Sequence, residues 1–88
     1  MPNNHPRRRA DLSIRVVDDE ALVLDRAAGL IHQFNTTACF IWQRCDGQRT
    51  AHEIADDLAR AFEIDAETAQ DAVMTSVRRF TELGLLQN

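Results

Sequence analysis

The sequence predicts an α+β domain in which a three-stranded antiparallel sheet precedes three helices, in a winged-helix-like arrangement. Two patterns predict this order. Three short segments rich in apolar and β-branched residues come first, and turn signals separate them. Apolar residues then recur at helical spacing over three further segments. The chain has 88 residues, which is enough for one domain and one core.

Two turn signals separate the expected strands. Asp18-Asp19 is a typical two-residue turn, and the segment 26–29 is a longer loop that ends in Gly. Short connections of this kind join neighbouring antiparallel strands, so the sheet should be a meander in chain order. The expected strands cover residues 13–17, 20–25 and 30–34.

The third expected strand alternates in its side chains. Leu30, His32 and Phe34 should face one side of the sheet, whereas Ile31 and Gln33 should face the other. In a meander this strand lies at an edge, so its outer backbone amide and carbonyl groups should be unpaired.

Capping residues divide the rest of the chain into three helices. Asn35 and Asp65 are favoured N-caps, and Thr50 begins a capping box. Gly47 and Gly84 can adopt the left-handed conformation that ends a helix, so we expect them to end the first and third helices. The expected helices span residues 36–45, 51–62 and 66–83.

The first ten residues are expected to form a flexible basic arm, and residues 11–88 the folded domain. The arm holds Arg7–Arg9 and two prolines, and it has little apolar surface to bury. No apolar segment follows its basic cluster, so it does not read as a secretory signal. No apolar run approaches the ~18 residues of a membrane span. A cytoplasmic location without a membrane partner is therefore expected.

The reactive side chains do not combine into an enzyme site or a metal site. Cys39 and Cys45 lie six positions apart on one expected helix, so they point about 240° apart and cannot share a metal ion. No cysteine or carboxylate stands at a catalytic spacing from His32. The three glycines are isolated, which excludes a phosphate-binding loop. We expect no catalytic residues, no metal and no cofactor.

The short connection at residues 63–66 is typical of a helix-turn-helix, so a winged-helix DNA-binding regulator is the alternative function. Charge argues against it, because the second expected helix carries a net charge of −2, and so does the third when its cap Asp65 is included. Beyond the arm, the chain has seven Arg, no Lys and fourteen acidic residues. Binding to phosphate depends on cationic contacts, so nucleic acid is not an expected partner.

The unpaired edge of the third strand indicates a peptide-binding surface. An extended peptide can join such an edge as a further strand and place alternate side chains in a neighbouring groove. We expect the third helix to run beside this strand, with an adaptable Met and an Arg on its non-core flank. Core filling by Met74 with a solvated Arg78, or pairing of two copies through this edge, are the other interpretations. The expected contacts are Leu30, Ile31, His32, Gln33, Phe34, Gln70, Met74, Arg78 and Thr81.

Several short motifs occur in a specific order. They are Leu-Asp before a Gly loop at 24–29, Phe-Asn at 34–35, CDGQRT at 45–50, EIADDL at 53–58 and FTELGLL at 80–86. In this order and spacing the chain resembles the PqqD family, the small peptide-recognition domains of modified-peptide biosynthesis. The resemblance covers about residues 13–86.

The resemblance implies a non-enzymatic chaperone that binds the leader of a ribosomally made precursor peptide. The third strand and the third helix would hold the leader, which is delivered to a modifying enzyme. That enzyme is a radical S-adenosylmethionine protein in the synthesis of pyrroloquinoline quinone. Carried over by position, the helix wall is drawn from Gln70, Met74, Val77, Arg78 and Thr81.

One segment departs from the family pattern. Members that serve pyrroloquinoline quinone synthesis usually carry a Pro-Glu pair before the third strand, where this chain has DRAAG at residues 25–29. The difference leaves open a related pathway with another peptide.

Overall fold

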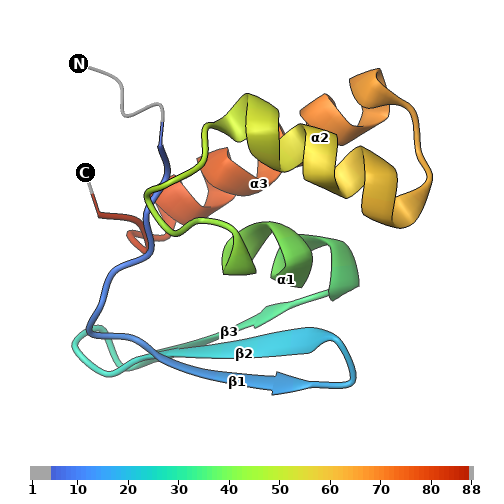
Figure 1. Ribbon diagram of the computed structural model, residues 1–88. Helices are drawn as coiled ribbons and strands as arrows, with labels where there is room; N and C mark the ends of the chain where they lie inside the picture. The colour runs from blue at the N-terminus through green and yellow to red at the C-terminus, as the bar shows by residue number, and fades with distance from the viewer. Residues whose placement is uncertain (1–4, 88) are drawn as a thin grey trace.

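The computed structural model describes residues 5–87, which form a three-stranded sheet with three helices on one side (Figure 1). The strands pair antiparallel in the order β1-β2-β3, as the sequence predicts. The α+β prediction is confirmed. The elements are β1 Ser13–Val17, β2 Glu20–Asp25, β3 Leu30–Phe34, α1 Thr36–Gln43, α2 Ala51–Phe62 and α3 Ala66–Glu82.

The register of the sheet decides which side chains face the helices. Ala21 and Val23 of β2 are fully buried, and their β3 partners are Phe34 and His32. Directly paired residues share a face, so the predicted alternation of β3 is confirmed. On the opposite face, Leu22 stays 41% exposed because no helix covers it.

The β1–β2 hairpin turns through Asp18 and Asp19 alone, because Val17 pairs with Glu20. Both aspartates have positive φ, 52° and 65°. A two-residue turn that follows the twist of the strands requires this conformation at both central positions. Asp tolerates it better than most residues other than Gly and Asn.

The predicted end of α1 is wrong by two residues. The Asn35 side chain caps its start by accepting a hydrogen bond from the Ala38 N–H at 2.9 Å, but the helix ends at Gln43, with Arg44 as its C-cap. The following residues pair with the N-terminal segment instead, since the Gly47 N–H donates to the Pro6 carbonyl at 3.0 Å. Gly47 has a φ of 80°, and a Cβ atom there would lie 3.1 Å from Arg7 Cδ.

An aromatic cluster joins three elements at the centre of the core. Phe34 of β3, Trp42 of α1 and Phe80 of α3 have ring centroids 4.9 to 5.4 Å apart. All three side chains are at most 4% exposed. Leu85, beyond α3, is fully buried and closes this core.

The segment expected to be a flexible arm is bound to the domain from residue 6 onward. The Arg8 N–H donates to the Cys45 carbonyl at 2.8 Å, and the Arg9 N–H donates to the Leu85 carbonyl at 3.0 Å. The Arg8 side chain also donates to the carbonyls of Trp42 and Gln43 at the end of α1. Backbone and side-chain hydrogen bonds, together with the burial of Pro6, hold this segment, which composition cannot show. Residues 1–4 of the expected arm lie outside the described residues.

Arg9 links the sheet to the end of the last helix. Its Nη1 lies 3.0 Å from the Asp25 carboxylate and 2.9 Å from the Gly84 carbonyl, and the guanidinium also binds Asp11. Asp25 is 3% exposed. The hydrogen bonds from Arg9 lower the pKa of both carboxyl groups.

The change Arg9→Gln should lower the free energy of unfolding at pH 7, and this loss should shrink as the pH falls below about 4. The folded-state pKa values of Asp11 and Asp25 are depressed, so their contribution is present above the unfolded-state pKa and disappears as pH falls through the folded-state value. Urea unfolding at pH 7 and pH 3, monitored by the fluorescence of Trp42, measures the loss in the free energy of unfolding at each pH. Arg78→Gln, which removes an Arg without an ion pair to the described residues, is the control. An equal loss at both pH values would contradict the prediction.

Candidate functional site

The candidate site is the groove between the free edge of β3 and α3. Within residues 5–87, no Cα atom of β3 lies within 8 Å of a Cα atom of α3. The rings of Phe34 and Phe80 meet at 4.9 Å and close the bottom of this gap. The hollow above them has a volume of about 400 Å³, and the first residues of α1 form its end.

The two walls of the groove run in opposite directions. Asp25 is paired with Leu30, the first residue of β3, and Arg9 connects Asp25 to Gly84, just beyond α3. The end of α3 therefore lies near the start of β3, and Figure 1 shows the same antiparallel course.

The β3 wall offers apolar side chains and a backbone edge. On the helix side, Leu30 is 50% exposed and Phe34 is buried, whereas Ile31, which is 69% exposed, lies on the opposite face of the sheet. His32 is half-buried on the helix side, and its Nε2 has no hydrogen-bond partner among the described residues. All five residues predicted from the sequence lie on this edge strand, and two of them, Gln33 and Phe34, line the hollow itself.

Part of the helix wall predicted from the sequence lies on the flank of α3 that faces α2. Gln70 and Met74 line a separate hollow with Ala51, His52 and Ala55 of α2, away from β3. The core residues of α3 face the sheet and α2 together, so the helix has two non-core flanks. Periodicity identifies both flanks and cannot say which one faces β3.

The other three predicted wall residues do not line the groove either. Val77 is half-buried against the core, and Arg78 is exposed. The Thr81 hydroxyl donates to the Val77 carbonyl at 2.8 Å, within its own helix. Thr81 lies seven positions after Met74, so it occupies the same flank.

Five α3 residues that the sequence analysis missed line the groove beside β3: Asp71, Ala72, Thr75, Ser76 and Arg79. Small side chains at Ala72 and Ser76, one turn apart, keep the helix surface low there. Such a pair of small residues on one flank was the signal available in the sequence. It indicates a place where another chain can approach the helix closely.

The groove carries one charge of each sign. Asp71 and Arg79 both line it, and neither forms an ion pair with another residue in the described part of the chain. Two α-helical turns separate them, so each is free to meet a charge on a guest. Bidentate pairing with a carboxylate is the interaction that Arg79 offers.

The cysteines are poor nucleophiles in this fold. Burial raises the pKa of Cys45 to about 12, and burial also raises the pKa of Cys39. Among residues 5–87, no group of three or more His, Cys, Asp or Glu side chains is placed to hold a metal ion. The helices of this same part are too short or too polar to cross a membrane.

The geometry agrees with comparisons to known proteins. Residues 20–86 match the family model of coenzyme PQQ synthesis protein D (PqqD). TbiB1 in complex with the TbiA(beta) leader peptide has 18% identity and a TM-score of 0.83, over 93% of this chain and 95% of that chain. Lasso peptide synthetase B1 complexed with the leader peptide has 25% identity and a TM-score of 0.82, over 96% and 99%. A search of curated proteins gives no match.

The burial of both thiols predicts slow reaction with Ellman's reagent in the native protein. With a pKa of about 12, roughly one Cys45 thiol in 10⁴ is ionised at pH 8, and the reagent attacks the thiolate. We expect fewer than two reactive thiols within minutes in buffer and two in guanidinium chloride, measured by absorbance. Rapid titration of both thiols in the folded protein would contradict the burial.

Proposed function

Because the chain belongs to the PqqD family, we propose that it binds the leader segment of a ribosomally made precursor peptide and presents it to a modifying enzyme. The free β3 edge, which faces α3 across an open groove, is the observation that carries this proposal. Two solved structures of the same fold are complexes with leader peptides, which supports it.

Backbone pairing would supply much of the affinity. The leader adds to β3 as a fourth strand, and its alternate side chains enter the groove beside Leu30, His32 and the small residues Ala72 and Ser76. Ordering a flexible leader costs roughly 2–5 kcal/mol, so the affinity should be moderate. Arg79 and Asp71 then select among leaders by the charges these carry.

The protein itself would carry no reaction in this scheme. Its partner enzyme, of the radical S-adenosylmethionine type or another class, supplies the chemistry in the cytoplasm. The pathway is pyrroloquinoline quinone synthesis or a related one, and the DRAAG sequence before β3 favours the related one. The acidity of α2 and α3 disfavours the winged-helix regulator.

Proline in β3 should weaken leader binding where it removes an N–H that points outward from the sheet edge. Successive amides of a strand point to opposite sides, so His32→Pro and Gln33→Pro together test both directions. Circular dichroism shows which of the two variants remains folded. That variant should bind the leader at least about tenfold more weakly, because the proline removes a hydrogen bond and blocks the strand edge. Calorimetry with a synthetic leader measures the affinity; its sequence would come from a short precursor peptide sought among the genes beside this chain's gene.

The matched control is Ser13→Pro. It places the same residue at the first position of the other edge strand, where proline is tolerated. This variant should bind the leader like the unchanged protein. A folded β3 variant with unchanged affinity would show that the leader does not pair with β3.

A second pair of variants tests which flank of α3 forms the wall. Thr75→Trp fills the groove beside β3, whereas Met74→Trp places the same ring on the flank that faces α2. Both residues are exposed, so both variants should fold. We expect Thr75→Trp to weaken leader binding at least about tenfold, as steric exclusion does, and Met74→Trp to leave it within about twofold. If Met74→Trp weakened binding and Thr75→Trp did not, the leader would contact the flank of α3 that was predicted from the sequence.

A further inference from the structure

The sheet has a second free edge, on β1, and this edge also faces a groove. β1 pairs with β2 alone, and no Cα atom of β1 lies within 8 Å of a Cα atom of α1 in the described part of the chain. Ile14 and Val16 point toward the helix side, because their partners are the buried residues Val23 and Ala21. They nevertheless remain 42% and 46% exposed, so the helices leave an apolar row uncovered.

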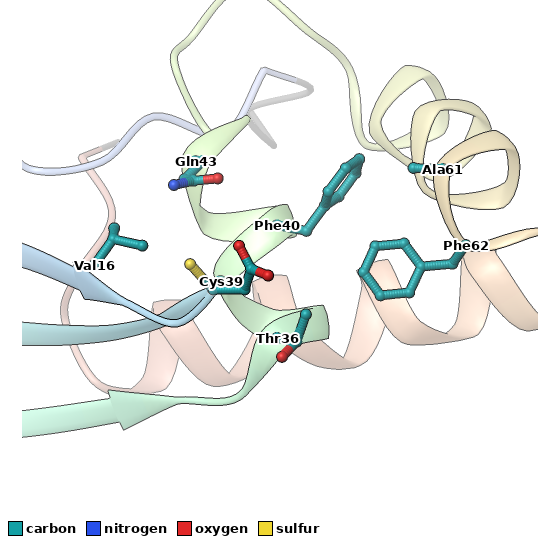
Figure 2. Close-up of a pocket in the computed structure, with 8 residues that line it drawn as sticks. Val16, Thr36, Cys39, Phe40, Gln43, Ala61 and Phe62 are labelled. Atoms are coloured by element: carbon teal, nitrogen blue, oxygen red, sulfur yellow. The ribbon is translucent and has the colours of Figure 1, made fainter.

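Figure 2 shows the hollow at one end of this groove, with a volume of about 270 Å³. Phe40 and Phe62 form one wall as an edge-to-face pair with centroids 5.3 Å apart. Cys39 and Val16 border it from α1 and β1. At the other end of β1, a second hollow lies between Ile14, the segment that follows α1 and the basic residues Arg7–Arg9. The groove therefore follows the strand, with an apolar hollow at the end near Val16 and a polar, basic one at the end near Ile14.

An acidic turn borders the first hollow. Asp18, Asp19 and Glu20 are consecutive and exposed, and Asp19 lines the hollow itself. Within residues 5–87, none of the three forms an ion pair. Three adjacent carboxylates repel each other, and a guest with a positive charge would relieve this repulsion.

We propose that the β1 edge is a second docking site, which binds an extended, basic and apolar segment of a partner protein. The segment pairs with β1 as a further strand and places an apolar side chain in the hollow of Figure 2. A Lys or Arg at its end lies against Asp18, Asp19 and Glu20. Because β2 separates β1 from β3, a leader on β3 and a partner on β1 are bound at the same time.

A second copy of this chain fits the β1 edge poorly. Full antiparallel pairing of two β1 strands sets Arg15 opposite Arg15 of the second copy and Asp19 opposite its Asp11. Like charges directly opposite each other destabilise a strand pair. The charges therefore favour a different protein over a dimer.

The experiment selects random dodecapeptides, displayed on phage, against the full-length protein and its variants. Val16→Gln removes the apolar contact at the hollow, and Val17→Gln makes the same change on the other face of the same strand. We expect selected peptides to carry Lys or Arg beside apolar residues. They should bind Val16→Gln about three- to tenfold more weakly and Val17→Gln within about twofold, as the loss of one partly buried apolar contact predicts.

The double variant Asp18→Asn, Asp19→Asn separates charge from backbone shape. Asn adopts the left-handed conformation as readily as Asp, so the hairpin is retained while two charges are lost. We expect binding of the selected peptides to fall about three- to tenfold at low salt, as exposed charge pairs predict. The difference should disappear in about 1 M salt, where screening is strong.

Amide chemical shifts of the ¹⁵N-labelled protein locate the bound peptide. Shifts at residues 13–19 and 39–43 support the proposal. Selected peptides that bind Val16→Gln and Val17→Gln equally, shifts confined to residues 30–34 and 72–79, or no selected peptide at all would overturn it. Concentration-dependent shifts of β1 without peptide would also overturn it, since they would assign this edge to a second copy.

Discussion

The contact of Phe34, Trp42 and Phe80 holds the last strand, the first helix and the last helix together, and both grooves depend on it. α1 has eight residues and rests over β2 and the end of β3, so it is too short to cover the whole sheet. Truncating a buried aromatic of this size costs about 3–5 kcal/mol, against a total stability of about 5–15 kcal/mol for a small domain. The cluster therefore sets the spacing of the grooves and leaves little freedom to change it.

Local chemistry made the strands and the helix starts predictable. Two aspartates that tolerate the left-handed conformation fix a two-residue hairpin, and the hairpin fixes the register of β1 against β2. Asn35 and Asp65 cap their helices through bonds that span three residues, and Thr50 and Glu53 bond each other's backbone. Every one of these interactions lies within a few positions of sequence, so a pattern can report it.

The features that the sequence did not predict depend on distant partners. Arg8 bonds carbonyls more than thirty positions away, at the end of α1, so its ordering cannot be inferred from the composition of residues 1–10. The groove-facing flank of α3 depends on how the helix rotates against α2, which only the packed core decides. For this reason the β3 half of the candidate site was predictable from alternation, whereas its helix half was not.

A sheet with two unpaired edges must bind a different peptide segment at each edge, and here the charges beside each edge can make that distinction. Backbone pairing accepts almost any extended segment, so β1 and β3 alone would bind the same peptides. The β1 edge ends at three unpaired carboxylates, whereas the β3 groove contains one acid and one Arg. A basic segment gains attraction from the β1 turn, whereas the β3 groove presents Asp71 and Arg79 together, and a segment that carries carboxylates is repelled by the β1 turn and can pair with Arg79. Discrimination of this kind rests on repulsion from the wrong edge as much as on attraction to the right one. It would let two five-residue edge strands each select a different chain.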